Sequence, residues 1–178
     1  MFPSSRVNHI LRVEQMAANL AAIHNLDPQK AASSRLMHDL AKCFKHQLLL
    51  YMAREKGLIL DPILETNPHP LHANTGAIVA RDTLCLQDQQ VLDAIANHTL
   101  GGPDMIELSC IVFLGDTLEL GRSPTTILKA LRQISRKNIS KAVYLTCDYT
   151  LKKFLGSPTL IYPLLIATRN TFLLKCKC

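Results

Sequence analysis

The adjacent residues His38 and Asp39 form the pair with the clearest chemical potential in the sequence. Neighbouring residues of a helix point about 100° apart, so both side chains would bind one ion only if they flanked it. Such a pair suits a site for one or two metal ions that other helices close. By itself the pair is a weak signal, because an ordinary helix end explains most adjacent His and Asp residues.

Asp116 is a second candidate, because it follows the apolar stretch 111–115. Burying a carboxylate without a partner is costly, so this residue requires a cation or strong hydrogen bonds. Several histidines also lie on predicted helices or at their ends. Together with the two carboxylates, the candidate metal ligands in chain order are His9, His38, Asp39, His72, His98 and Asp116. Each histidine taken singly is more simply explained by a structural role, but the order of the whole set is more specific.

The elements that must position these residues are helices. Apolar residues recur at steps of three and four from Val7 to Ile23, which is typical of an amphipathic helix. Asp27 followed by Pro28 predicts the start of the next helix. By the same reasoning the sequence predicts helices over 7–23, 28–40, 46–56, 71–84, 88–97, 106–120, 126–136, 141–155 and 160–174. No segment alternates as a strand would, so we predict one all-α domain of eight or nine helices over residues 1–178, with a mainly loop-like stretch at 57–70.

Composition narrows the class of protein. The chain has 178 residues, of which 48% are hydrophobic and 19% are charged, as is typical of a globular domain. No apolar run approaches the roughly 20 residues that a membrane-spanning helix needs. The formal net charge is +6, and residues 90–178 carry most of it. This excess could attract nucleic acid or a phosphorylated small molecule. A solvated helix face is the simpler explanation, and with few aromatic residues for base stacking we do not expect nucleic acid as a partner.

The six cysteines have no CxxC pair and no regular spacing. Most of them lie in apolar helical patterns, where a free cysteine behaves as a small core residue. The N-terminal residues also lack the pattern of a secretory signal. We therefore expect a reducing, cytoplasmic environment and no disulfide framework.

Six short stretches of the sequence carry a resemblance to a known family. They are 6–13 (RVNHILRV), 38–42 (HDLAK), 70–73 (PLHA), 94–101 (AIANHTLG), 115–122 (GDTLELGR) and 168–170 (TRN). In this order they resemble the HD domain superfamily of metal-dependent phosphohydrolases. Within it the sequence is most similar to the YqeK group, the symmetrical bis(5'-nucleosyl)-tetraphosphatases. The resemblance implies a helical bundle of the HD type over nearly the whole chain.

For the metal centre the resemblance implies two divalent ions. One ion would be held by His9, His38, Asp39 and Asp116. The second ion would be held by His72 and His98, with Asp39 bridging both ions. Imidazole and carboxylate ligands suit iron, manganese or zinc, and iron is the ion that the family implies.

Three further histidines, His24, His46 and His69, match no family motif, and we interpret them as surface or loop residues. His69 precedes His72 by three residues and is an alternative ligand. The prolines on either side of His69 disfavour a helix face shared by the two rings.

Phosphate needs positive charge near the ions. Lys42 follows His38 by four residues and would share its helix face. The planar guanidinium of Arg122, just beyond Gly121, suits bidentate contact with phosphate. We assign catalytic roles to Asp39, Lys42 and Arg122, and both basic residues would also bind substrate.

Four other residues are predicted substrate contacts. Thr99 and Gly101 would offer a hydroxyl and backbone N–H groups in the loop after His98. Glu119 would orient Arg122 or hold a ribose hydroxyl. Arg169 matches a motif arginine of the family, although a surface ion pair explains it equally well.

The resemblance implies a hydrolase that splits dinucleoside tetraphosphates, chiefly diadenosine tetraphosphate, symmetrically into two ADP. Two cations that share a water would lower its pKa to about 7, far below that of bulk water. One alternative is a related phosphohydrolase acting on another nucleotide, such as a nucleoside monophosphate. Another is a non-catalytic regulator on the same fold that binds nucleotide or RNA. The expected partner is the dinucleoside polyphosphate substrate, with no membrane, and we also consider a homodimer.

Overall fold

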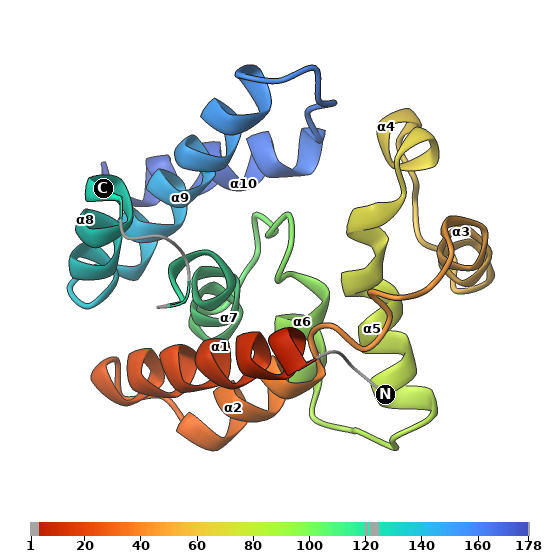
Figure 1. The fold of residues 1–178 in the computed structure, drawn as a ribbon, viewed down its shortest axis with the longest axis horizontal. Helices are drawn as coiled ribbons and strands as arrows, with labels where there is room; N and C mark the ends of the chain where they lie inside the picture. Colours follow the sequence, from red (N-terminus) through yellow and green to blue (C-terminus); the bar gives the residue numbers. More distant parts are fainter. Residues whose placement is uncertain (1–3, 120, 122–124, 178) are drawn as a thin grey trace.

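The protein is all-α in the computed structural model, which describes residues 4–119, 121 and 125–177, with side chains described from residue 11 onward (Figure 1). Within these residues there is no strand. The helices in chain order are α1 (Ser4–Ile23), α2 (Pro28–Met37), α3 (His46–Glu55), α4 (Pro62–Thr66), the short 3-10 helix η1 (His69–Leu71), α5 (His72–Asp82), α6 (Gln89–Ala96), α7 (Glu107–Leu118), α8 (Thr126–Ser135), α9 (Ile139–Leu155) and α10 (Pro163–Lys175). The all-α prediction is confirmed.

Three of these helices begin after an aspartate that caps the N-terminus. Oδ1 of Asp27, of Asp61 and of Asp88 each accepts hydrogen bonds from the N–H groups two and three residues later. Such caps stabilise a helix because its first N–H groups have no partner within the helix. The predicted starts after Asp27 and Asp88 are confirmed. The same signal at Asp61 begins α4, a short helix within the mainly loop-like stretch 57–70. The described residues therefore form ten α-helices, where eight or nine were expected.

Helix α7 lies at the centre of the fold and packs against α1, α2, α6, α8 and α9 (Figure 1). Its residues 108–115 are all buried. Burying a large apolar side chain contributes about 1.5–3 kcal/mol, so this helix is the main source of core stability. Asp116 follows the buried run directly, which places its carboxylate where the core meets the candidate site.

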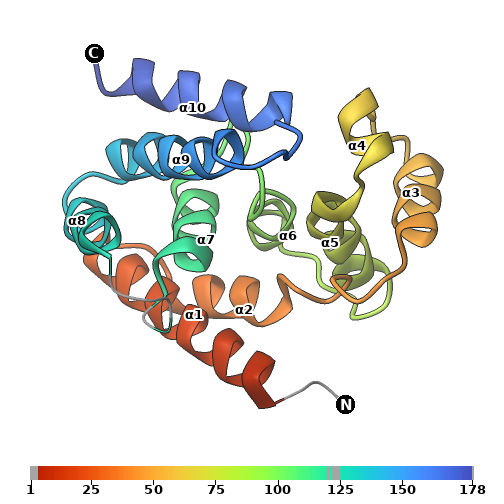
Figure 2. The same cartoon turned by 45° about the horizontal axis from the view of Figure 1, so that its top comes forward.

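Helices α9 and α10 run side by side over one side of the molecule, and α3 and α4 lie beyond α5 (Figure 2). The connection between α9 and α10 turns toward α4 in both views (Figures 1 and 2). This arrangement brings residues near 154–162 close to residues near 67–72, although the two segments are far apart in sequence.

The segment that carries His38 and Asp39 differs from the prediction. Helix α2 ends at Met37, and residues 38–43 form successive turns instead of continuing the helix to residue 40. The N–H of Lys42 bonds to the carbonyl of Asp39, three residues back, at 3.1 Å. The predicted helix face shared by His38 and Lys42 is therefore wrong, and the His–Asp pair lies at a helix end.

Two cysteines differ from the expectation that those in apolar helical patterns lie in the core. Cys110 and Cys147 are buried, but Cys43 and Cys85 are exposed, because these two lie in turns or connections outside the helices. Cys176, which follows α10, is exposed as well. In the part of the chain that the structure describes, no helix is both long enough and apolar enough to cross a membrane.

Candidate metal centre

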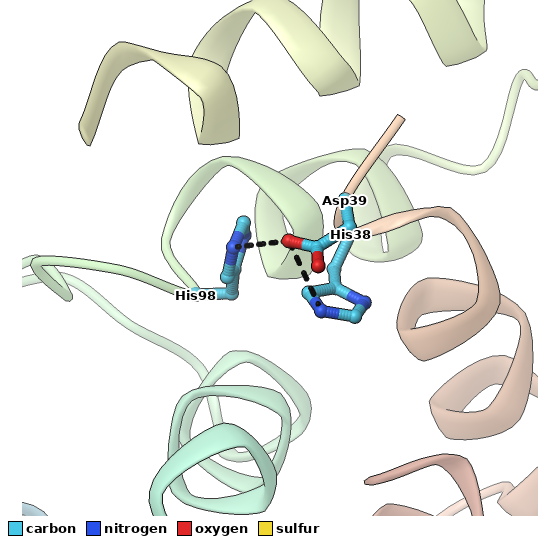
Figure 3. A group of neighbouring side chains, drawn as sticks. All are labelled: His38, Asp39 and His98. Carbon is cyan, nitrogen blue, oxygen red and sulfur yellow. Dashed lines mark ion pairs between the residues drawn. The ribbon is translucent and has the colours of Figure 1, made fainter. Parts of the chain in front are cut away.

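The candidate metal centre combines residues from three separate parts of the chain. His38 and Asp39 follow α2, His72 begins α5 and His98 follows α6, and all four residues are buried. Oδ1 of Asp39 lies 3.2 Å from Nε2 of His38, 3.7 Å from Nε2 of His72 and 3.9 Å from Nε2 of His98. Figure 3 shows this carboxylate oxygen between the rings of His38 and His98. The fold thus brings together four of the six predicted ligands.

The three imidazole rings are held in the same way by the backbone. In each ring Nδ1 donates a hydrogen bond to the carbonyl three residues earlier, at 2.6 Å for His72 and 2.8 Å for His98. His38 and His98 follow the ends of α2 and α6, and His72 follows the 3-10 helix η1, so each ring can fold back onto a carbonyl of the turn before it. With the proton on Nδ1, each Nε2 carries a lone pair directed into the centre.

These lone pairs make the centre suitable for a cation. Nε2 of His72 and Nε2 of His98 are 3.1 Å apart, and neither can donate a hydrogen bond while its proton is on Nδ1. Electron-rich atoms at this distance repel one another unless a positive ion lies among them. Potential ligand atoms of His38, Asp39 and His98 lie within 4.8 Å of one another. Imidazole nitrogens with a carboxylate suit a divalent transition metal, so the residues fit a metal ion.

The protonation states favour the same conclusion. Burial lowers the pKa of His72 to about 4. Burial also lowers the pKa of His38 and of His98, and the nearby positive charge of Arg35 acts in the same direction. For Asp39, burial alone would raise the pKa, but the charge of Lys42 and its hydrogen bond to Oδ2 hold the pKa below its usual range. Neutral imidazoles and an ionised carboxylate are the forms that bind metals.

Arg35 is a buried residue beside the candidate centre that the sequence analysis missed. Its side chain is fully buried, with Nη1 3.1 Å from the carbonyl oxygen of Val112 and Nη2 3.6 Å from Oδ1 of Asp116. Asp116, on the last turn of α7, is thereby drawn toward α2. The available signal was a charged residue on the apolar face of the helix, three positions before His38.

A pocket of about 510 Å³ adjoins the metal centre. Among the predicted site residues it is lined by Lys42, His72, Thr99 and Asp116. His46 and His69 also line it, and both are exposed, as expected of surface or loop residues. The ring of His69 lies 5.0 Å from that of His72, measured between centroids, and its carbonyl is the one that orients His72.

Three predicted substrate contacts have other partners in the structure. The N–H of Gly101 donates to the carbonyl of Asn97, and a Cβ at this position would lie 2.6 Å from Thr168, so close packing accounts for this glycine. Oε2 of Glu119 accepts bonds from Arg12 and from the N–H of Gly121.

The third of these residues, Arg169, lies on α10, and its Nε donates to Asp148 at 2.8 Å. Two predicted site residues are not placed by the structure. The side chain of His9 and the whole of Arg122 lie outside the part that the structure describes.

Comparison with known proteins agrees with this geometry. The model of the HD domain family matches residues 6–121. The symmetrical bis(5'-nucleosyl)-tetraphosphatase of Halalkalibacterium halodurans is 33% identical over 97% of this chain and 91% of its own length. The protein of the same name from Bacillus subtilis is 28% identical over 93% of this chain and 88% of its own length.

A solved structure from Clostridium acetobutylicum, described as a predicted HD superfamily hydrolase involved in NAD metabolism, is also similar. It matches with a TM-score of 0.92 and 29% identity, over 98% of this chain and 92% of that one. The order of the candidate ligands, the helical fold and these likenesses agree. The chain therefore belongs to the HD domain family and, within it, to the group of the symmetrical bis(5'-nucleosyl)-tetraphosphatases.

Proposed function

We propose that this protein hydrolyses dinucleoside tetraphosphates, chiefly diadenosine tetraphosphate, symmetrically to two ADP. The observation that carries the proposal is the convergence of three imidazole Nε2 atoms on one oxygen of Asp39, beside a pocket of about 510 Å³. The cationic side chain of Lys42 in that pocket suits a polyphosphate chain. The names of the relatives that align over nearly the whole chain support the choice of substrate.

The proposal includes two divalent metal ions. His9, His38, Asp39 and Asp116 would hold one ion. His72 and His98 would hold the other, with Asp39 bridging. Iron is the ion that we propose, with manganese and zinc as alternatives that the same ligands accept. When bound, such ions supply Lewis acidity and lower the pKa of water to about 7.

In the proposed reaction, water adds to one of the two central phosphorus atoms. The bond from this phosphorus to the central bridging oxygen breaks, so each product keeps two phosphates. Asp39 would be held for this reaction by Lys42, whose Nζ lies 2.9 Å from Oδ2. Lys42 also lines the pocket, where its charge would stabilise the negative charge that develops on the phosphoryl oxygens.

The other substrate contacts stay proposals drawn from the sequence. They are Thr99, Gly101, Glu119, Arg122 and Arg169, with Arg122 also assigned a catalytic role. We infer further that the enzyme acts in the cytoplasm. A homodimer remains a prediction that a measurement of mass in solution would test.

Product analysis tests the proposal directly. The protein would be purified anaerobically, its metal content measured, and diadenosine tetraphosphate supplied with Asp39→Ala as the inactive control. We expect ADP as the only nucleotide product. AMP and ATP in equal amounts would show asymmetric cleavage and contradict the proposal. Activity confined to nucleoside monophosphates would favour the related phosphohydrolase, and nucleotide binding without hydrolysis would favour the regulator.

A further inference from the structure

An ion pair joins α1 to the end of α7, one helical turn beyond Asp116. Nε of Arg12, on α1, lies 2.9 Å from Oε2 of Glu119, which directly follows α7. The carboxylate is buried, whereas the side chain of Arg12 is 41% exposed. The same Oε2 accepts a hydrogen bond from the N–H of Gly121 at 2.6 Å. One buried oxygen of Glu119 therefore holds both α1 and the chain that leaves α7.

The end of α7 is also held from α8. Nε of Arg132 donates to the carbonyl of Leu118, and its Nη2 donates to that of Glu119, each at 2.8 Å. Carbonyl groups in the last turn of a helix have no N–H partner within that helix, so a basic side chain there stabilises the helix end. Gly121 leaves the room that this arrangement needs, because a Cβ at this position would overlap the guanidinium of Arg12. Charged groups of two helices thus fix the end of α7.

Helices α1 and α7 cross one another and pack closely at Gly115 (Figures 1 and 2). A Cβ on Gly115 would lie 3.4 Å from Cγ1 of Val13 and 3.6 Å from Cβ of Ala17. A packed crossing point resists separation of two helices but constrains the angle between them less strongly. The ion pair between Arg12 and Glu119 is a further point of contact, so it constrains this angle.

The crossing angle matters because both helices carry proposed ligands of one ion. Asp116 is next to Gly115 and would move little if α1 turned about this crossing. His9 precedes Val13 by four residues, or about 6 Å along the helix axis, so a change of about 10° would move its backbone by about 1 Å. Metal–ligand distances vary by only about 0.2 Å. A shift of this size would therefore weaken a site that His9 and Asp116 share.

We infer that Arg12 is a positioning residue that, through Glu119, holds α1 at the angle at which His9 and Asp116 share an ion. The inference rests on the ligand assignment in the proposed function and adds a residue outside the ligand set. Removing Arg12 should weaken this ion and spare the other, whose two histidines begin α5 and follow α6. A general loss of stability would instead weaken both ions alike. Arg12 is the residue to change, because Glu119 is itself a proposed substrate contact.

Calorimetric titration of the metal-free protein with Mn²⁺ tests this role. The parent should bind two ions. Arg12→Met should weaken one of them about tenfold, since loss of a group that orients ligands costs about ten- to a hundredfold in metal affinity. Arg12→Lys keeps a cation beside Glu119 and should restore most of the affinity. Gly121→Ala should weaken the same ion, because its Cβ would displace the guanidinium of Arg12, so it decides the matter if Arg12→Met does not fold.

Lys30→Met is the matched control. Lys30, on α2, also pairs at 2.9 Å with a residue of another part of the fold, Asp88 at the start of α6, and its side chain is 36% exposed. This variant should bind both ions as the parent does. Asp116→Ala should remove the ion that Arg12 affects, so adding Arg12→Met to it should leave the affinity for the remaining ion unchanged.

Parental affinity for every ion in Arg12→Met, or an equal loss of both ions, would overturn the role of Arg12. Product analysis separates this result from the proposed function. Selective loss of one ion in Arg12→Met, with a parent that leaves diadenosine tetraphosphate intact, would support the role of Arg12 and refute the proposed hydrolysis. Hydrolysis to ADP by a parent whose ions do not depend on Arg12 would refute the role of Arg12 and support the hydrolysis.

Discussion

Arg35 and Asp116 form an ion pair at the buried edge of the metal centre, with Nη2 of the guanidinium 3.6 Å from Oδ1 of the carboxylate. The backbone carbonyl of Arg35 also accepts the hydrogen bond from Nδ1 of His38. One residue of α2 therefore orients a carboxylate on α7 and an imidazole at its own helix end. Because a buried charge is stable only beside a partner, Arg35 links the stability of the core to the geometry of the centre.

Arg35→Met should lower the free energy of unfolding of the metal-free protein by about 1–3 kcal/mol, because the charged hydrogen bond to Val112 and the pair with Asp116 are lost. The loss should be smaller in the metal-loaded protein, where an ion compensates the charge of Asp116. Urea denaturation with and without metal measures both values. Arg54→Met, which removes an exposed pair with Glu65, is the control and should change little. Equal losses of stability in the metal-free and metal-loaded proteins would contradict the idea that Arg35 and the metal ion both compensate the charge of Asp116.

Asp39→Ala should abolish metal binding and hydrolysis while the helical fold survives, because this carboxylate is at the centre of the ligand set. Metal analysis and circular dichroism measure the two effects. Retention of about two ions per chain would refute the bridging role. His24→Ala serves as a control, since its ring bonds to Ser135 at 2.7 Å and is not among the ligands; this variant should keep its metal.

The metal-free protein should lose stability as the pH falls from about 6.5 to about 4. Burial lowers the pKa of His72 from 6.5 to about 4. Above pH 6.5 the imidazole of His72 is neutral in both the folded and the unfolded protein, so its protonation does not reduce the free energy of unfolding. Between pH 6.5 and about pH 4, His72 binds a proton in the unfolded chain but stays neutral in the folded protein. The free energy of unfolding therefore falls by about 3 kcal/mol through this residue alone.

His38 and His98 act in the same direction, because their pKa values are also lowered by burial. Urea denaturation in the presence of a chelator, repeated between pH 7.5 and pH 4, measures the effect. His72→Gln should reduce the slope of stability against pH. If the free energy of unfolding did not change between pH 7 and pH 5, the imidazole rings of His38, His72 and His98 would not be held neutral in the folded state.

Arg122→Lys should lower kcat/KM for diadenosine tetraphosphate without changing the metal content. Lysine keeps the charge but loses the bidentate fork, and loss of such a contact costs about 1.5–3 kcal/mol, or roughly ten- to a hundredfold in rate. Arg122→Ala should cost at least as much. Steady-state kinetics with metal analysis tests this, and parental activity in both variants would remove Arg122 from the site.

The helical class and most helix starts were predictable because their causes are local. Capping by Asp27 and Asp88 depends on residues two or three positions away. The turn at Gly57, where φ is +69°, likewise follows from the residue type. The order of the candidate ligands was recognisable in the sequence, because it resembles a family motif residue by residue, and their role as ligands stays a prediction.

The arrangement of those residues in space was decided only by the tertiary structure. The sequence suggested a helix through His38 and Asp39, but packing ends α2 at Met37 and lets the ring fold back onto a carbonyl. The position of Arg35 on the apolar face of α2 indicates burial, but only the fold shows that its partner is Asp116 and that Phe154 lies near His72 in one pocket. The sequence alone determined which residues could bind metal and which segments are helical, since both depend on residue type and short spacing. Which helix ends meet, and therefore which charges and rings share a site, depended on long-range packing of the core around α7.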